Sequence, residues 1–255
     1  MEEQKQFKIQ GGSLEKSLNG ETQLDLKAIA KEAWDLSKNT KTAVLHGVLL
    51  LFFIAIVFAW ALQSVFGITD LSIVPPRMMI SLKVAGIIVT TPIIAAMFLL
   101  GIAHSVGIKP RFLSILKNVM GSVLVILLAL LLAAMSDVGS IIGSQVSVLL
   151  GLAVLFYINL ATGFSIMLLV EKKLAPSQCV VQSLRVFHKY WIPLSIFYMV
   201  YYCCLFLGAL SLGFAYIWII PFFINMKGIL YRELFGVTVV NDKNQSTPDE
   251  TVFHA

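Results

Sequence analysis

Charged residues are scarce in this chain. Aspartate, glutamate, lysine and arginine make up 13% of its 255 residues, whereas apolar residues make up 58%. Soluble globular proteins contain about 25% charged and roughly 45–50% apolar residues. The composition therefore excludes an ordinary soluble domain. It also changes the meaning of the net charge of +5, because basic residues beside membrane spans follow from insertion topology and need no nucleic-acid partner.

Cysteine is equally scarce, and no catalytic pattern stands out. Cys179, Cys203 and Cys204 form neither a disulfide framework nor a zinc site, since two of them are sequence neighbours that point to different helix faces. The sequence contains no phosphate-binding glycine loop, metalloprotease helix or nucleophile elbow. The four histidines are scattered over different segments: His46, His104, His188 and His254. We therefore predict no catalytic residue, no metal or other cofactor, and no enzymatic activity.

The first apolar run is far from the start of the chain. Residues 1–42 are polar and lysine-rich, so we predict no cleavable signal peptide and interpret them as a cytoplasmic segment with an amphipathic helix. Ionisable residues are also missing from the centres of the predicted spans. Because charge buried in a membrane is expensive and typically functional, this absence argues against a proton-coupled or ion-coupled transporter.

Long apolar runs dominate the rest of the chain. A hydrocarbon core about 30 Å thick is crossed by roughly 20 apolar residues in a helix. Four runs are suited to one crossing each: 43–66, 84–106, 119–135 and 146–170. Residues 191–226 carry no charge and are too long for one crossing, so we expect a hairpin turn near 208–213. We predict an all-α integral membrane domain of six transmembrane helices over residues 43–236, followed by a disordered cytoplasmic tail, 237–255.

The basic residues give the predicted orientation. Of 19 lysines and arginines, only Arg77 and Lys83 fall in the predicted outer segments. Because cytoplasmic loops carry the excess of lysine and arginine, both termini are predicted to be cytoplasmic. Lys227 is placed near the cytoplasmic end of the last span, where its long side chain could reach the headgroups.

A threefold repeat organises the predicted spans. Short amphipathic segments that end in a basic-polar pair precede each odd-numbered span, at 34–39, 113–118 and 185–190. We interpret the unit as an amphipathic elbow helix plus a transmembrane hairpin, used three times. In the third elbow, Phe187 and Leu184 are expected to insert at the headgroup boundary. Four basic residues of the elbows are predicted headgroup contacts: Lys38, Lys117, Arg185 and Lys189.

The even-numbered spans repeat one another in part. Pro92 and Pro221 are each followed by a methionine and a glycine at identical offsets, whereas the fourth span has Thr162 in place of a proline. Proline removes a helical hydrogen bond, so we predict helix kinks at Pro92 and Pro221. The alternative interpretation is that entry helices and basic flanks are common to most membrane proteins.

Two stretches carry a resemblance to a known family. The first comprises the apolar run that ends in Glu171-Lys172-Lys173, followed by Ala175, Ser183 and residues 187–191; the second is Pro221 followed by Tyr231-Arg232-Glu233-Leu234-Phe235-Gly236. They are similar to the YciC-type proteins of the bacterial inner membrane and to the membrane domain that accompanies some glycerophosphodiester phosphodiesterases. The resemblance implies a multi-pass protein of the bacterial inner membrane. It does not extend to phosphodiesterase activity, because the polar tails are too short for that domain.

One polar set lies inside a predicted span. Asn159, Thr162 and Ser165 are spaced by three and are expected to share one helix face. Such a seam either forms interhelical hydrogen bonds or lines a path for a solute.

These observations lead to a functional hypothesis and its alternatives. We predict a non-enzymatic accessory or envelope-homeostasis factor that acts through membrane lipids or a membrane-protein partner. The alternative is a transporter or channel for an uncharged or amphipathic solute. A membrane-embedded lipid enzyme would require acidic, histidine or serine groups clustered at one depth, and the sequence does not supply that cluster.

Overall fold

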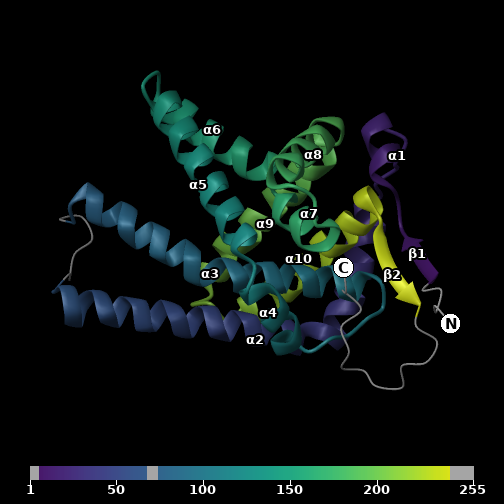
Figure 1. The fold of residues 1–255 in the computed structure, drawn as a ribbon, viewed down its shortest axis with the longest axis horizontal. Coiled ribbons are helices and arrows are strands. Elements are labelled where there is room, and N and C mark those ends of the chain that lie inside the picture. The colour runs from purple at the N-terminus through teal and green to yellow at the C-terminus, as the bar shows by residue number, and fades with distance from the viewer. Residues whose placement is uncertain (1–5, 68–73, 242–255) are drawn as a thin grey trace.

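A computed structural model describes residues 6–67 and 74–241, and over that part the chain is almost entirely helical (Figure 1). The helices are α1 (Leu14–Asn19), α2 (Leu26–Phe66), α3 (Pro76–Ser105), α4 (Phe112–Met120), α5 (Val123–Ser144), α6 (Val148–Ala161), α7 (Ser165–Lys172), α8 (Pro176–Lys189), α9 (Trp191–Leu210) and α10 (Tyr216–Phe235). The strands are β1 (Gln6–Gln10) and β2 (Val237–Asn241).

Five helical segments are long and apolar enough to cross a membrane: Leu26–Ser64, Arg77–Ser105, Val123–Ser144, Val148–Lys172 and Trp191–Leu210. The helix α10 is not among them, and its 20 residues include Lys227, Arg232 and Glu233. Figure 1 shows α2 and α3 as one long pair that extends to the left, and α5 and α6 as a second pair that extends to the upper left. The predicted all-α membrane character is therefore supported.

Large apolar side chains cover the outward faces of these helices. They include Phe52, Trp60, Leu149 and Phe206, each more than 45% exposed. A water-soluble monomer rarely exposes apolar patches of this extent. The exposed faces are therefore suited to lipid.

The first predicted elbow is not a separate helix, and this prediction was wrong. Residues 34–39 lie inside α2, which runs without a break from Leu26 to Phe66, so the predicted domain boundary at residue 42 also falls within a helix. No glycine or proline lies between residues 26 and 46. The other two elbows are separate because Ser122 is extended before α5, and because Pro193, in the first turn of α9, has no amide hydrogen to continue the ladder of α8.

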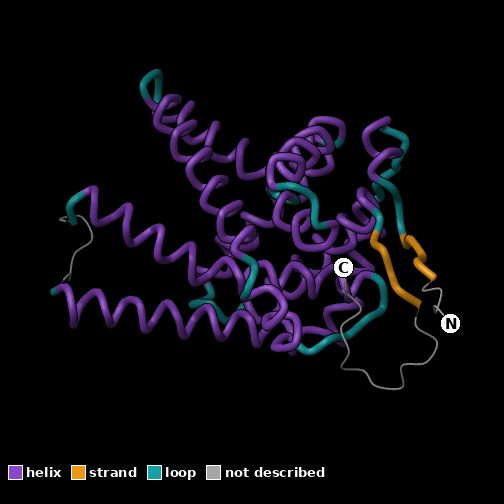
Figure 2. Tube along the Cα trace, in the orientation of Figure 1, coloured by secondary structure: helices purple, strands orange, loops and turns teal. Residues whose placement is uncertain are grey.

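The two ends of the described chain form a small sheet. Strands β1 and β2 pair antiparallel, with Ile9 opposite Thr238, and they lie on the far side of the molecule from the tips of the helical pairs (Figure 2). Residues 237–241 were predicted to be disordered, and this was wrong: Gly236 adopts a φ of 65° that turns the chain out of α10 and into β2. The remainder of the predicted tail, 242–255, lies outside the described residues.

The helices meet in a core that gathers the second half of α3, the first half of α2 and most of α10. Trp34 in α2 packs edge-on against Phe222 in α10, with ring centroids 6.1 Å apart. The tightest crossing joins α3 to α10 at Gly101 and Gly228, where a Cβ on either glycine would overlap main-chain atoms of the other helix. Glycine lets helix backbones approach closely in a membrane, so this crossing fixes α10 against α3.

A charged pair connects two of the helical pairs farther out. The ammonium group of Lys83 in α3 donates to the carboxylate of Asp137 in α5, with an Nζ–Oδ1 distance of 2.6 Å. Both side chains are about half exposed, at 48% and 44%. Pairing offsets part of the desolvation that each charge would otherwise suffer in a bilayer.

Candidate functional site

A buried polar network joins α2, α3 and α10. Asn225 in α10 is fully buried, and its Oδ1 lies 2.8 Å from Nδ1 of His104 in α3. The Nδ2 of the same amide donates to Ser37 Oγ at 2.9 Å and to Thr40 Oγ1 at 3.1 Å, both in α2. Three helices that are far apart in the sequence thus share one amide.

The direction of each hydrogen bond in this network follows from the two hydroxyls. Ser37 and Thr40 each donate to a main-chain carbonyl four residues earlier in α2, so their oxygens are left to accept. The NH₂ group of Asn225 must face them, and its carbonyl oxygen then accepts from Nδ1–H of His104. The histidine Nε2 is buried and has no hydrogen-bond partner among the described residues.

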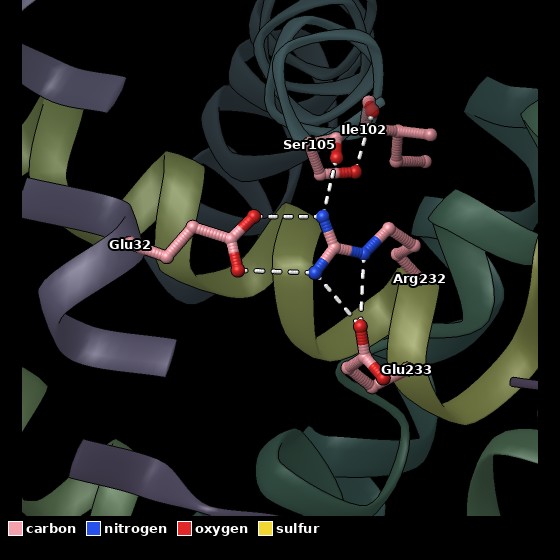
Figure 3. A network of polar contacts seen from close by, with 5 residues as sticks. All are labelled: Glu32, Ile102, Ser105, Arg232 and Glu233. Carbon is pink, nitrogen blue, oxygen red and sulfur yellow. Dashed lines mark hydrogen bonds and ion pairs between the residues drawn. The ribbon is translucent and has the colours of Figure 1, made fainter. Parts of the chain in front are cut away.

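A second network, nearer the sheet, is built around Arg232 (Figure 3). Its guanidinium group binds both carboxylate oxygens of Glu32 in α2, at 2.7 and 3.0 Å. It also donates to the main-chain carbonyl of Ser105 at the end of α3 and to Glu233 at 2.9 Å. The planar fork of arginine is suited to several acceptors at once. The group therefore fastens the ends of α2 and α3 to α10.

Residues that carry the family resemblance meet on the other side of α10. The phenol of Tyr231 donates to Glu171 Oε2 at 2.8 Å, and the amide of Thr238 in β2 donates to Glu171 Oε1 at 3.2 Å. The Glu171 side chain is only 3% exposed. Glu171 and Tyr231 thus connect α7 and β2 to α10.

A cavity of about 190 Å³ lies between α3, α6, α9 and α10. Lys227 of α10 lines it, and its ammonium nitrogen lies 3.9 Å from the ring centroid of Phe98 in α3. No carboxylate lies within ion-pair distance of Lys227 in the described ranges 6–67 and 74–241. The other polar groups of the wall come from α6 and α9: Asn159, Tyr198, Tyr201 and Tyr202.

The break between α6 and α7 shapes one end of this cavity. Gly163 lies in that break, and a Cβ there would overlap the hydroxyl of Tyr198. The Tyr198 hydroxyl is buried and has no hydrogen-bond partner in the described part of the chain. A buried hydroxyl without a partner is unfavourable by about 1–3 kcal/mol. The wall thus holds an unsatisfied hydrogen-bonding group and a cation without a carboxylate.

The structure places the three residues of the predicted seam in different surroundings. We predicted that they share one helix face. They do not, because the helix ends at Ala161 and a new helix begins at Ser165. Asn159 lines the cavity, and its Nδ2 donates to the carbonyl of Leu155 at 2.7 Å. Thr162 is buried and donates to the carbonyl of Ile158 at 2.7 Å. The hydroxyl of Ser165 is buried, with no partner in the described ranges.

The two predicted kink residues both lie inside helices. Pro92 and Pro221 are both buried within continuous helices, α3 and α10. In each helix the proline precedes the stretch that contains the glycine crossing, Gly101 or Gly228.

The predicted headgroup contacts are all exposed, but the third elbow does not insert as expected. Lys117, Arg185 and Lys189 point away from the core, and Lys38 pairs with Asp35 at 2.9 Å on the surface of α2. Phe187, which was predicted to enter the headgroup boundary, is only 5% exposed and packs edge-on against Tyr157 of α6. That prediction was wrong because α6 covers this face of α8.

The buried cysteine, Cys179, has a setting that does not favour reactivity. Cys179 is buried in α8, and burial raises the pKa of its thiol to about 11. A raised pKa keeps the sulfur protonated and unreactive at neutral pH. Among the described residues, no group of three or more histidine, cysteine or acidic side chains could hold a metal ion.

Sequence reasoning missed Lys227, Asn225 and His104. Lys227 ends a long uncharged run and was therefore assigned to a cytoplasmic flank, but α10 continues to Phe235 and places it within the helix. The available signal for Asn225 and His104 was their polarity within or beside apolar runs, because polar side chains there are costly unless partnered.

Comparisons with protein-family models, with curated proteins and with solved structures find nothing that matches this chain.

Proposed function

We propose that this chain is a non-enzymatic membrane protein that acts through contacts with anionic lipids at the cytoplasmic face of the bacterial inner membrane. In this proposal the chain crosses the membrane six times, as three elbow-and-hairpin units, with both termini in the cytoplasm. The bacterial location rests on the family resemblance, and the orientation rests on the distribution of lysine and arginine.

The sixth crossing in this proposal is α10. Its 20 residues span about 30 Å at 1.5 Å per residue, the thickness of a hydrocarbon core. Arg232 and Glu233 are paired within the protein, and Lys227 has an aromatic contact but no ion pair in the described ranges. Lys227 lies over the Phe98 ring, and Arg232 is bound by Glu32 and Glu233. Charges that face protein and find partners are tolerated at membrane depth.

The observation that carries the proposal is a basic groove between α1 and α8. It has a volume of about 520 Å³ and is lined by Leu18, Leu184, Arg185, His188 and Lys189. Next to it, Trp191 begins α9 and is 58% exposed. Tryptophan is enriched at membrane interfaces. A groove with basic walls and an apolar floor beside an interfacial tryptophan fits the phosphate and glycerol of a lipid headgroup.

The charge of the groove comes from Arg185 and Lys189. His188 is already engaged: its Nδ1 lies 2.8 Å from the carbonyl of Leu184, and its Nε2 lies 2.8 Å from the hydroxyl of Tyr157. Both ring nitrogens of His188 are therefore occupied by partners within the protein. Arginine and lysine near a membrane surface each contribute about 1 kcal/mol of attraction to anionic lipids.

Removing the charge of the groove should weaken anionic-lipid binding. In nanodiscs, we expect anionic lipid to raise the thermal unfolding temperature of the wild type above its value in zwitterionic lipid. The double variant Arg185→Gln, Lys189→Gln should lose most of this gain, because it removes about 2 kcal/mol of attraction.

The matched control removes the same charge from outside the groove. Lys27 and Lys31 are exposed on the first turns of α2, and Lys27→Gln, Lys31→Gln should keep most of the gain. If both double variants lose the gain in unfolding temperature equally, the effect depends on net charge alone, and the groove is not the lipid-binding site.

Orientation has its own test. Glu15 on α1 and Gln145 at the turn between α5 and α6 are exposed. In a Cys203→Ser, Cys204→Ser background, a cysteine at position 145 should react with an impermeant maleimide in intact cells, whereas one at position 15 should react only after membrane disruption. Labelling of both positions from outside would contradict the proposed topology.

The cavity beside Asn159 favours a second candidate function, a transporter for an amphipathic solute. Asn159 lines this cavity together with aromatic side chains of α9 and α10, so a polar group inside a largely apolar wall is available to a solute that has both characters. Uptake of a labelled amphiphile into vesicles that contain the protein distinguishes this candidate from the first.

A further inference from the structure

The cavity around Lys227 has polar groups that suit a ligand. It is separate from the groove between α1 and α8 and shares no lining residue with it. The ammonium group of Lys227 is held over the Phe98 ring at 3.9 Å. A cation–π contact stabilises the charge by about 0.5–2 kcal/mol. Lys227 is half-buried, and an ion that is taken out of water without a counter-ion is destabilised by several kcal/mol, which is more than this contact provides. An anion beside this nitrogen would supply the missing compensation.

Further polar groups surround the same space. The hydroxyl of Tyr198 is buried without a partner in the described ranges, and Asn159, Tyr201 and Tyr202 line the same wall. A hydroxyl donates one hydrogen bond and an ammonium group donates three. The Nδ2 of Asn159 already donates to the carbonyl of Leu155 and to Ser136 Oγ, so the donors that the cavity offers to an anion with several oxygens are the ammonium group and the tyrosine hydroxyls.

The size of the cavity limits what can enter. Sites for drug-sized molecules have volumes of roughly 300–1,000 Å³, and this cavity has about 190 Å³. It accommodates a compact anionic group and a few carbon atoms, but not a whole lipid. The remainder of such a ligand has to lie outside.

The surroundings decide what the remainder is. The rings of Phe197, Tyr201 and Phe223 form a continuous aromatic wall, with Tyr201 and Phe223 centroids 4.9 Å apart. On the outward face of the adjoining α9, Met199 and Phe206 are 69% and 67% exposed. A hydrocarbon chain that leaves the cavity would meet apolar side chains and bilayer, whereas a hydrophilic remainder would not.

We propose that the cavity around Lys227 binds the compact anionic head of a single-headed amphiphile, a carboxylate or a phosphate monoester, with its hydrocarbon tail in the bilayer beside α9. Lys227 provides the ion pair, and Tyr198 donates a hydrogen bond to a second oxygen. The inference rests on the proposed function only in taking the surroundings to be a bilayer. The two can fail separately, because one concerns Arg185 and Lys189 and the other concerns Lys227.

Protein purified in a neutral detergent is the material for the test, with a long-chain fatty acid as the probe. We expect native mass spectrometry to show one retained fatty acid and the unfolding temperature to rise with its concentration. The fatty alcohol of equal chain length tests the anionic head, and acetate and inorganic phosphate test the tail. A long-chain alkyl phosphate should bind like the acid. The fatty alcohol should bind at least about tenfold more weakly than the acid, since a charge-assisted hydrogen bond contributes more than a neutral one. Acetate and inorganic phosphate should also bind at least about tenfold more weakly, because they have no hydrocarbon tail.

Two variants locate the site. Lys227→Met should lower the affinity for the acid at least about tenfold, while the matched variant Lys27→Met, at an exposed lysine outside both the cavity and the groove, should leave it unchanged. Tyr198→Phe removes only an unsatisfied hydroxyl, so the unliganded protein should be as stable as the wild type or more stable. Its affinity for the acid should nevertheless fall severalfold, and this keeps the test valid even if Lys227→Met fails to fold.

Three results would overturn the inference. If the acid and the alcohol bind equally, the site does not recognise an anionic head. If acetate or inorganic phosphate binds as tightly as the fatty acid, the site binds free anions and does not require a hydrocarbon tail. If neither single variant, Tyr198→Phe or Lys227→Met, changes the affinity for the acid, the ligand binds elsewhere. The basic groove would stand in each case, since its own test depends on Arg185 and Lys189.

Discussion

Gly101→Ala should abolish the close crossing of α3 and α10 and lower the free energy of unfolding by about 3 kcal/mol or more. The new Cβ would overlap the carbonyl oxygen of Ile224, which is main chain and cannot move as a side-chain end can. Overpacking typically destabilises by about 1–3 kcal/mol, and occasionally by more. The crossing also carries the network around Asn225, so a shift of α10 would leave buried polar groups without partners.

The same helix supplies the control for this prediction. Gly86 lies in α3, and a Cβ there would have nothing within 4 Å. Gly86→Ala should therefore be neutral or slightly stabilising, because alanine has the higher helix propensity by about 1 kcal/mol. The measurement is the unfolding midpoint of both variants in the same detergent. If the two midpoints agree, the helices do not cross at Gly101.

The membrane character and most helices follow from the sequence because they depend on local properties. The apolar runs, the stop at Glu171-Lys172-Lys173 and the turn near Gly208 each lie within one stretch of chain. The break before α9 is equally local, because Pro193 in the first turn of α9 has no amide hydrogen to donate back to α8. Local rules were wrong for α2, where nothing in the sequence enforced the break that the repeat predicted.

The helix pairing does not follow from local properties. Glu32 looks like one polar residue of an amphipathic segment, and only the fold places it against Arg232. Asn225 looks like an isolated amide until α2 and α3 bring Ser37 and His104 to it. One sequence supplies no distance between remote residues. The polar groups could be recognised as unusual, but their partners could not be named.

The candidate site illustrates the same limit. Asn159 was singled out from its position in an apolar run, and it does line the cavity. Lys227 was not singled out, because a lysine at the end of an uncharged run is normally a flanking residue. Whether Lys227 lies inside the helix or in a flank depends on where α10 ends, and helix ends are the hardest feature to predict from sequence.

Arg232→Gln should release the start of α2 and lower the free energy of unfolding by about 2–3 kcal/mol. Breaking a buried ion pair removes roughly 3–5 kcal/mol, and the smaller value applies here because the Glu32 side chain is 40% exposed and water can solvate it again. Arg232→Lys should recover little of the loss. A lysine cannot bind both Glu32 oxygens and the carbonyl of Ser105 from one planar group.

Hydrogen exchange distinguishes this local role from a general loss of stability. In Arg232→Gln the amides of the first turns of α2 should exchange faster, because Glu32 no longer holds that part of the helix against α10, whereas those of α5 and α6 should not change. Lys38→Gln is the matched control on the same helix. Its partner Asp35 is 60% exposed, and an exposed pair contributes about 0–1 kcal/mol. If exchange in α2 is the same in the Arg232 and Lys38 variants, the guanidinium network does not hold α2, and the packing of Trp34 against Phe222 has to account for its position.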